Sequence, residues 1–273
     1  MSSLRPFLTQ ARAELTCDVA AVNELGETVS VTIPVERALT VYVDKREIVT
    51  LMTMGAQPEL LVLGFLRNQR LVQSAEEVES ITVDWEVGAA AVKTRHGVSD
   101  IETRTSKRIV TTGCGQGSVF GDLMQDVDQI ALPDTRITKS QLYEMVNTIR
   151  LQDCVYKKSG SVHGCGLFQN GELLYFVEDV GRHNALDTIA GWMTLQDSMS
   201  ALGKVFYTTG RLTSEMVIKS AQMGVAVVVS RSGITQMGHA VAQKLNLCTI
   251  GRALNKRFFC FSGQDRLLQD PDS

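Results

Sequence analysis

The chain has 273 residues, of which 44% are hydrophobic and 21% are charged, and this composition is typical of an ordinary soluble globular protein. Its formal net charge is −3, so no overall basic field indicates nucleic acid or an anionic membrane surface as a partner. No stretch approaches the ~20 uninterrupted apolar residues of a membrane helix, and Met1–Leu15 lacks the apolar core of a signal peptide. A cytoplasmic protein is therefore expected.

Residues 1–108 are expected to form a β-rich domain. Short extended runs alternate with turn signals over residues 18–54, and a further hairpin is predicted over Ser80–Glu86 and Ala89–Arg95. Between them a helix is predicted over Glu59–Leu66 after Pro58, because proline is tolerated at the first helical position. No pattern in this part indicates chemistry, so we interpret it as a scaffold or interaction domain.

A cysteine in a glycine-rich loop follows, within Ile109–Gly121. A β-branched run predicts a short strand that ends at Gly113, and Cys114 then lies in a loop with Gly115 and Gly117. Such a loop can fold back and point several backbone N–H groups at one position, where they stabilise a thiolate, the form of cysteine that attacks and carries sulfur. Cys114 is therefore the candidate catalytic residue. The alternative is a glycine-rich turn that holds a small buried cysteine.

The other five cysteines do not indicate a metal site. None of the six belongs to a Cys-x-x-Cys pair, and Cys154 and Cys165 are far apart for a zinc knuckle, so their roles stay open. Cys248 and Cys260 lie in apolar runs, which favours positions in the core. Free thiols are expected in a reducing compartment.

Residues 109–273 are expected to form a second domain. An amphipathic helix is predicted over Lys139–Leu151 with Thr138 as its N-cap, and a hairpin is predicted around Asn170 and Gly171. Strands and amphipathic helices then alternate to Phe261. This alternation predicts right-handed βαβ units and a mainly parallel sheet. The predicted fold class is α/β, or α+β for the chain as a whole.

Four loops that follow predicted strands each carry a glycine and an arginine. The pairs are Gly181 with Arg182, Gly210 with Arg211, Gly233 with Arg231, and Gly251 with Arg252. Loops at the carboxyl ends of parallel strands meet at one edge of a sheet, helix N-termini favour phosphate, and arginine offers it paired donors. Together the loops predict one anionic-ligand site, where Asp179, His183 and Asn184 would hydrogen-bond a base, ribose or pterin edge. For any single loop, ordinary capping and a surface arginine are the alternative.

Five stretches follow one another in a familiar order along the chain. They are Thr111–Gly115, Ser161–His163, Glu178–Asp187, Thr209–Arg211 with Glu215–Val217, and Thr249–Gly251. Together they resemble the FdhD family, the sulfur-carrier accessory proteins of formate dehydrogenases. The resemblance covers nearly the whole chain and implies a β-rich N-terminal part and a C-terminal α/β domain with a cytidine-deaminase-like fold. It also implies a function: sulfur from a cysteine desulfurase passes to the molybdenum cofactor, a bis-pterin guanine dinucleotide, before the cofactor enters the dehydrogenase.

Residue by residue, the resemblance implies that Cys114 carries the persulfide. The second cysteine of the family's Cys-x-x-Cys loop is replaced by Gly117, and the family's cofactor-binding segment matches Arg252–Arg257 in position. The residues then expected to bind the guanine nucleotide part of the cofactor are Asp179, Gly181, Arg182, His183, Asn184, Thr209, Gly210, Arg211, Ser230, Arg231, Arg252, Ala253, Leu254, Asn255, Lys256 and Arg257. The zinc signature of deaminases is missing, so neither deamination nor a metal site is expected.

Two functions from different classes stay open. In the favoured one, the Cys114 thiolate attacks a partner's persulfide while the arginine loops hold the cofactor's phosphates, so that positioning dominates the rate. In the alternative, the protein is a non-catalytic chaperone that binds the molybdenum cofactor or its enzyme and moves no sulfur, an option that Gly117 keeps open. A homodimer is expected from the habit of the family, and no nucleic-acid or membrane partner is expected.

Overall fold

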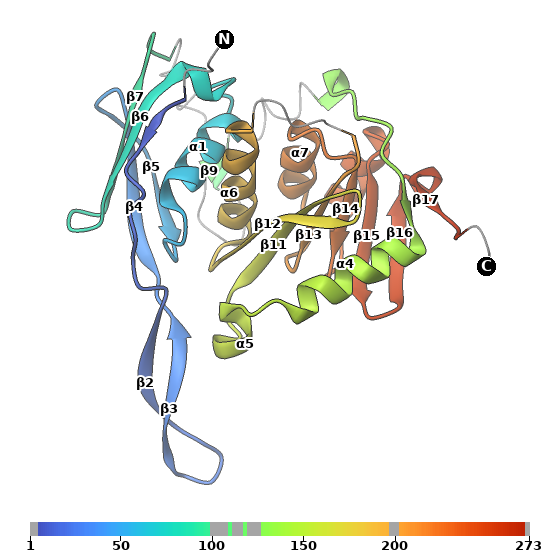
Figure 1. Ribbon diagram of the computed structural model, residues 1–273, viewed down its shortest axis with the longest axis horizontal. Helices are drawn as coiled ribbons and strands as arrows, with labels where there is room; N and C mark the ends of the chain where they lie inside the picture. Colours follow the sequence, from blue (N-terminus) through green and yellow to red (C-terminus); the bar gives the residue numbers. More distant parts are fainter. Residues whose placement is uncertain (1–4, 99–108, 111–116, 119–126, 197–201, 271–273) are drawn as a thin grey trace.

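The structure is a computed structural model that describes residues 5–98, 109–110, 117–118, 127–196 and 202–270 (Figure 1). A first sheet has the strand order β1-β6-β7-β4-β5. Its strands are β1 (Phe7–Leu8), β4 (Arg37–Val43), β5 (Arg46–Thr53), β6 (Val78–Asp84) and β7 (Ala89–Thr94). The expected domain boundary at residue 108 lies outside the described residues.

Helix α1 (Pro58–Asn68) packs on one face of this sheet, with the short 3-10 turn η1 (Ala75–Glu77) beyond it. The helix begins at Pro58, as the sequence predicts. In β4 every second side chain is buried, and Leu39 and Val41 pack in one core with Leu61 and Leu66 of the helix. The period of two along the strand thus selects the face that meets α1.

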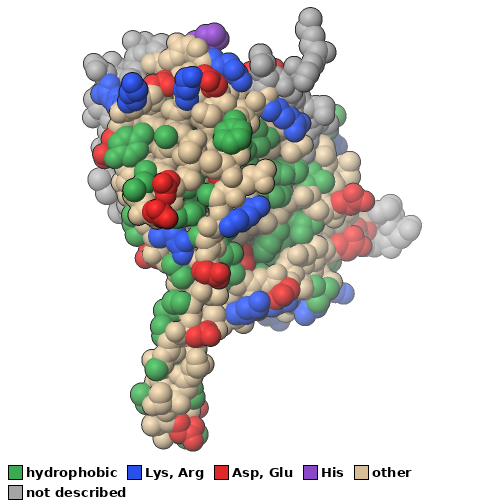
Figure 2. All heavy atoms as spheres, turned by 60° about the vertical axis from the view of Figure 1, so that its left-hand side comes forward, with side chains coloured by type: hydrophobic (Ala, Val, Ile, Leu, Met, Phe, Trp, Pro, Cys, Tyr) green, Lys and Arg blue, Asp and Glu red, His purple; other side chains and the backbone are tan. Residues whose placement is uncertain are grey.

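Strands β2 (Thr16–Val22) and β3 (Thr28–Pro34) form a separate antiparallel hairpin that projects from the body of the molecule, and we call it the arm (Figures 1 and 2). One of its faces is apolar. Three cross-strand pairs make that face: Cys17 with Ile33, Val19 with Val31, and Ala21 with Val29. Val19, Val29, Val31 and Ile33 are each between 36% and 38% exposed, so this face lies open to solvent.

A second sheet has six strands in the order β12-β11-β13-β14-β15-β16. They are β11 (His163–Gln169), β12 (Glu172–Asp179), β13 (Lys204–Thr208), β14 (Val227–Ser230), β15 (Cys248–Leu254) and β16 (Arg257–Ser262). The α/β class is confirmed. The sheet is mixed, however, where the sequence predicts a mainly parallel one: β13-β14 and β14-β15 are parallel, and the other three pairings are antiparallel. Short turns join β11 to β12 and β15 to β16, and such turns permit only antiparallel pairing.

Helices cover both faces of this sheet (Figure 1). On one face lie α6 (Arg182–Thr194), α7 (Ser214–Gln222) and α8 (Gln236–Lys244), and on the other lies α4 (Lys139–Leu151), which is followed by the short α5 (Val155–Ser159). Strand β13 shows how the residues divide: Phe206 packs under α6 and α7, whereas Val205 and Tyr207 face α4. A strand that is buried on both faces has a continuous apolar sequence, because none of its side chains faces solvent.

The two halves of the chain meet where α1 crosses α6, and Figure 1 shows these helices side by side. Glycines stand at the crossing. A Cβ on Gly64 would overlap the carbonyl oxygen of Asp187, and a Cβ on Gly191 would overlap that of Leu60. The two helix backbones are therefore in direct contact, which only glycine permits at these positions.

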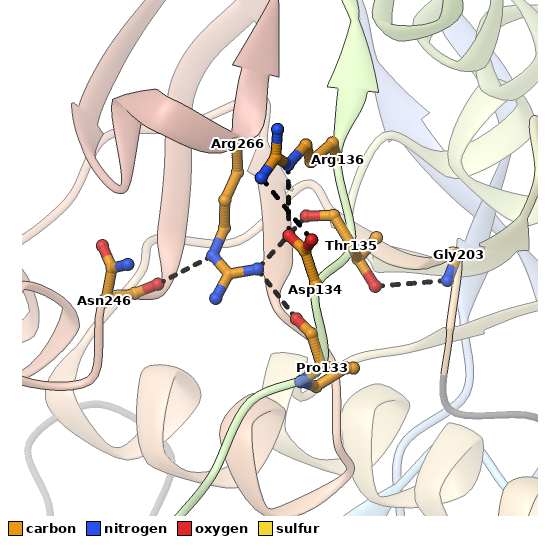
Figure 3. A network of polar contacts seen from close by, with 7 residues as sticks. All are labelled: Pro133, Asp134, Thr135, Arg136, Gly203, Asn246 and Arg266. Carbon is orange, nitrogen blue, oxygen red and sulfur yellow. Dashed lines mark hydrogen bonds and ion pairs between the residues drawn. The ribbon is translucent and has the colours of Figure 1, made fainter.

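The C-terminal segment is fastened to the start of α4. Strand β17 (Leu267–Leu268) pairs in parallel with β10 (Ile137–Thr138), and short 3-10 turns η2 (Val127–Gln129) and η3 (Gln264–Arg266) precede the two strands. Beside them, the buried guanidinium of Arg266 donates to the carbonyl oxygens of Asn246 at 3.0 Å, Pro133 at 2.8 Å and Thr135 at 3.3 Å (Figure 3). Within the described ranges, none of the helices combines the length and the apolar character needed to cross a membrane.

Candidate functional site

The four glycine-arginine loops meet at one edge of the second sheet. Strands β12 and β13 are both antiparallel to β11, so β12, β13, β14 and β15 all run in the same direction and end at that edge. Ser230 Oγ donates to the carbonyl of Gly210 at 2.7 Å, and the N–H of Arg252 donates to the carbonyl of Ser232 at 2.7 Å. A Cβ on Gly210 would lie 2.8 Å from Cδ of Arg182. The sequence-based expectation that these segments gather is confirmed, but Gly251 and Arg252 lie within β15 (Cys248–Leu254) and not in a loop that follows it.

Three backbone N–H groups of these loops are engaged within the protein. Those of Gly181 and Gly210 donate to side chains of the preceding strands, Asp179 Oδ1 at 2.9 Å and Thr208 Oγ1 at 3.0 Å. The N–H of Arg231 donates to the Thr208 carbonyl at 3.0 Å. The side chains of Arg211, Arg231 and Arg252 are exposed, so they are open to an anion at this edge.

A groove opens beside the loops, between the edge of the sheet and helices α4 and α5. A first cavity has a volume of about 290 Å³, and a second, adjoining cavity of about 460 Å³ shares Tyr156, Thr209 and Arg231 with it. The first cavity is lined by Val146, Ile149, Arg150, Cys154, Tyr156, Lys157, Gly164, Phe176, Glu178, Tyr207, Thr209, Arg231, Ala253, Leu254 and Asn255. Gly160, Ser161, Val162, His163 and Ser232 complete the second cavity. The groove thus joins an apolar wall to basic side chains.

The predicted binding residues fall into three groups. Thr209, Arg231, Ala253, Leu254 and Asn255 line the groove. Arg211, Arg252, Lys256 and Arg257 are exposed on the surrounding surface. Asp179, Gly181, Arg182, His183, Asn184, Gly210 and Ser230 are buried beneath it. Cys114 lies outside the described residues, although β8 (Ile109–Val110) and β9 (Gly117–Ser118) pair with each other in antiparallel fashion on either side of residues 111–116.

Asp179 joins the two halves of the chain. Its carboxylate accepts hydrogen bonds from Thr53 Oγ1 and the N–H of Met54 at the end of β5, and from Gly181 and Asn184 at the start of α6. Burial raises the pKa of Asp179, and these donors oppose that effect. Asn184 also donates to the Met52 carbonyl at 2.6 Å. Both side chains are fully engaged in holding the turn after β5 against the turn before α6.

A cluster of charged side chains lies beneath the loops, among α1, α6 and α7. Lys219 Nζ is 2.9 Å from Asp187 Oδ2 and 3.4 Å from Glu215 Oε1, and Asn68 Nδ2 donates to Asp187 Oδ1 at 2.6 Å. His183 Nε2 is 3.5 Å from Glu215 Oε2. Burial, with Lys219 and Arg182 nearby, lowers the pKa of His183 to about 2, so this imidazole is neutral.

The pKa of His163 is an indicator of the electrostatic potential at the second cavity. Its Nδ1 lies 3.3 Å from Thr209 Oγ1. Burial lowers the pKa of His163, and the positive charges of Arg182 and Arg211 lower it further. The surroundings of this ring therefore disfavour a cation, and the part of the effect that comes from Arg182 and Arg211 would favour an anion.

The two described cysteines near the groove, Cys154 and Cys165, do not have the lowered pKa of a nucleophilic thiol. Burial raises the pKa of Cys165 to about 12, and its thiol donates to Thr208 Oγ1 at 3.4 Å, so it is a core residue. Cys154 lines the groove, but burial raises its pKa as well. Across the described part of the chain, no group of three or more His, Cys, Asp and Glu side chains is placed to hold a metal ion.

The sequence model of the FdhD/NarQ family matches residues 34–268. The chain belongs to the FdhD/NarQ family. Among its relatives, the sulfur carrier protein FdhD of Listeria monocytogenes serotype 4b is 28% identical over 235 residues, which are 85% of this chain and 90% of the relative. That of Bacillus subtilis is 30% identical over 234 residues, which are 85% of this chain and 88% of the relative.

The structure is also similar to a solved FdhD/NarQ-like chain. This crystal structure, described as a proposed formate dehydrogenase accessory protein from Desulfotalea psychrophila, has a TM-score of 0.74 and 25% identity, and the match covers 93% of this chain and 98% of the other. The family resemblance expected from the five stretches is thus confirmed. The family match begins at Pro34, so it leaves out almost all of the arm and includes both sheets from β4 onward.

Sequence reasoning missed one wall of the groove in this FdhD/NarQ chain. Arg150, Tyr156 and Lys157 come from α4 and α5, which precede the second sheet in the chain. The guanidinium of Arg231 lies over the ring of Tyr156, 5.4 Å from the ring centroid. This cation–π contact orients the arginine. The polar, glycine-rich stretch Lys157–Gly164 was the available signal, since loops of this composition often line binding sites.

Proposed function

We propose that the protein is a sulfur carrier that passes persulfide sulfur from a cysteine desulfurase to the molybdenum cofactor during the maturation of a formate dehydrogenase. Membership of the FdhD/NarQ family carries this proposal, and it is supported by relatives named sulfur carrier proteins. The similar crystal structure, described as a proposed formate dehydrogenase accessory protein, supports formate dehydrogenase as the enzyme that is served. These steps are expected in the cytoplasm, where cysteines stay reduced.

Cys114 carries the sulfur in this proposal. As a thiolate it attacks the outer sulfur of the desulfurase persulfide, a new S–S bond forms on Cys114, and the desulfurase cysteine leaves as a thiolate. In the second step the cofactor, which is the substrate, supplies an electron pair to the outer sulfur: a bond forms between that sulfur and the cofactor, the S–S bond breaks, and Cys114 leaves as a thiolate. Each step exchanges one bond to sulfur for another, so one thiol is sufficient although Gly117 replaces the family's second loop cysteine.

The groove is the proposed place for the guanine nucleotide part of the cofactor, which is a substrate here. Ile149, Phe176 and Tyr207 offer an apolar wall against which a planar base packs. Arg231 and Lys157 on the same groove are suited to phosphate oxygens. The positive charges of Arg182 and Arg211, which help to lower the pKa of His163, would favour negative charge in the adjoining cavity.

The second candidate function is a chaperone that binds the cofactor and moves no sulfur. The observation that favours it is the glycine at position 117, because the backbone of Gly117 pairs with Val110 where the family has its second cysteine. The two candidates share the groove and differ only in whether Cys114 accepts sulfur. A measurement of the mass of the protein, which shows whether sulfur has been added, distinguishes the two candidate functions.

The decisive experiment is incubation of the protein with a cysteine desulfurase and cysteine, followed by intact-mass and peptide analysis. We expect a gain of one sulfur atom that maps to Cys114 and is absent in Cys114→Ser. Cys17→Ser, which removes an exposed thiol on the arm, is the control and should gain the sulfur like the wild type. If no sulfur is found on Cys114, the chaperone is the correct function.

Binding of guanosine diphosphate, measured by calorimetry, tests the groove. We expect Arg231→Ala and Arg211→Ala to weaken binding about tenfold or more, since each removes a charged partner worth roughly 1.5–3 kcal/mol. Arg95→Ala, beyond the first sheet, should leave the affinity unchanged. Equal affinities in all three variants would remove these loops from the site.

Light scattering of the same samples tests the expected homodimer.

A further inference from the structure

Two thiols touch each other in the last hairpin of the second sheet. The Sγ atoms of Cys248 on β15 and Cys260 on β16 lie 3.9 Å apart. Both side chains belong to the core beneath α4, where Cys248 is completely buried and Cys260 is half-buried. This contact lies in the covered core of the hairpin, and no step proposed above uses either thiol.

The backbone brings the two thiols together through an irregularity in the pairing of the strands. Thr249 pairs with Ser262, but its neighbour Ile250 pairs with Cys260, so Phe261 is an extra residue in β16. Such a bulge bends the strand and turns its side chains toward the partner strand. As a result, Cys260 leans toward the beginning of β15, where Cys248 is located.

The two thiols are chemically unequal. The hydrogen bond with Cys248 lowers the pKa of Cys260, whereas the same contact, together with burial, raises the pKa of Cys248. Cys260 is also the member that reaches solvent. An attacking thiol needs thiolate character and access, and a resolving thiol needs only to be adjacent. Cys260 meets the first requirement and Cys248 the second.

We propose that Cys260 and Cys248 form an oxidisable dithiol whose substrate is hydrogen peroxide and whose product is a disulfide that joins β15 to β16. In the first step the Cys260 sulfur attacks the peroxide, the O–O bond breaks, and Cys260 becomes a sulfenic acid while hydroxide leaves. In the second step the Cys248 sulfur attacks the Cys260 sulfur, the S–O bond breaks and water leaves. The dithiol gives two electrons to the peroxide, and both peroxide oxygens end as water.

The location gives this reaction a structural consequence. The tip of the same hairpin carries Leu254 and Asn255, which line the groove, and the thiol pair lies toward the other end of β15. A disulfide would therefore cross-link the base of the element whose tip forms one wall of the groove. The proposal does not rest on sulfur transfer by Cys114.

The test uses the full chain, reduced and then treated with hydrogen peroxide, with Cys114→Ser as the background so that the loop thiol does not exchange. We expect the loss of both thiols, a mass lower by two hydrogen atoms, and one disulfide that links the peptides holding residues 248 and 260. Adding Cys248→Ser should leave a sulfenic acid on Cys260 that dimedone traps. Adding Cys260→Ser should leave Cys248 reduced.

Cys17→Ser is the matched control, because Cys17 is exposed and lies on the arm. Its disulfide yield should equal that of the background. Peptide mapping of the background protein needs no further variant. The proposal is overturned if this mapping shows that hydrogen peroxide oxidises Cys260 no faster than Cys17. It is equally overturned if the oxidised protein carries no link between residues 248 and 260.

Discussion

Lys219 and Asp187 form an ion pair 2.9 Å long in which neither side chain has any exposure to solvent. Asp187 is the last residue of the stretch Glu178–Asp187 that most strongly indicates the family, and Lys219 comes from the next helix along the chain. The ammonium also faces Glu215 at 3.4 Å. The single Lys219 cation therefore balances two buried carboxylates. Its loss would leave both carboxylates without a cation, and an unpaired buried charge is strongly destabilising.

The first prediction concerns this cation. Lys219→Met keeps the length of the side chain and removes its charge, so we expect a loss of about 3–5 kcal/mol in the free energy of unfolding. Lys93→Met is the control, because Lys93 pairs with Glu79 at 2.7 Å but is 65% exposed, and its loss should cost less than about 1 kcal/mol. Urea denaturation measures both. Similar losses in the two variants would show that the buried cation has no special role.

The second prediction concerns pH. The pKa of His183 is about 2 in the folded chain and that of an unfolded histidine is about 6.5, so below pH 6.5 protons bind preferentially to the unfolded state. Stability from this group is complete above pH 6.5 and falls as the pH drops toward 2, by about 2 kcal/mol between pH 7 and pH 5. His163, whose pKa is also lowered, adds to the loss with the same sign.

Urea denaturation at pH 7 and pH 5 checks this dependence. In His183→Asn the difference between the two free energies of unfolding should shrink by about 2 kcal/mol. His96→Asn should leave the difference as in the wild type, because His96 is exposed in the folded chain. An unchanged difference in His183→Asn would mean that the folded chain protonates His183 as readily as the unfolded chain does.

The third prediction tests the contact between the two halves at Asp179. Asp179→Asn replaces an acceptor oxygen with a donor that faces other donors, so at least one buried group loses its partner at a cost of about 1–3 kcal/mol. Hydrogen exchange should become faster at the N–H groups of Met54 or Gly181. Asp84→Asn, whose oxygen accepts only from the exposed Glu86 N–H, should change neither quantity. Unchanged protection in Asp179→Asn would contradict the assigned contacts.

The fourth prediction concerns the helix crossing. Gly191→Ala would add a methyl group that overlaps the Leu60 carbonyl, so α1 and α6 have to separate, and we expect a loss of about 1–3 kcal/mol or more. In an open helix the same change gains up to about 1 kcal/mol, so the sign alone is informative. Gly233→Ala is the control, because a Cβ there meets no atom within 4 Å. Thermal unfolding of both variants measures the difference, and a stabilised Gly191→Ala would contradict the crossing.

The sequence predicts local structure well where a signal is local. Thr138 caps α4 as predicted: its hydroxyl accepts from the Gln141 N–H at 3.2 Å, and the Gln141 side chain accepts in return from the Thr138 N–H at 3.0 Å. The gathering of the four loops also follows from alternation of strands and helices. The hairpin around Asn170 and Gly171 is confirmed, because β11 and β12 pair in antiparallel fashion. The antiparallel direction of β16 was missed, because an apolar run does not reveal whether its neighbour is joined to it by a turn or by a helix.

The site itself was harder to predict. Asp179, His183 and Asn184 carry polar groups in a loop after a strand, which is the pattern of a binding site, yet all three are buried, and Asp179 and Asn184 contact the first half of the chain. Their contacts with Thr53 and Met52 span more than a hundred residues, and periodicity contains no information about such pairs. The wall made by α4 and α5 was missed for the same reason.

The contacts of the C-terminal segment with the start of α4 have a practical consequence for truncated variants of this protein. Arg266 and β17 hold the beginning of α4 in place, and the second half of α4 supplies Val146, Ile149 and Arg150 to the groove. Shortening the chain before residue 266 would thus release a helix more than a hundred residues upstream.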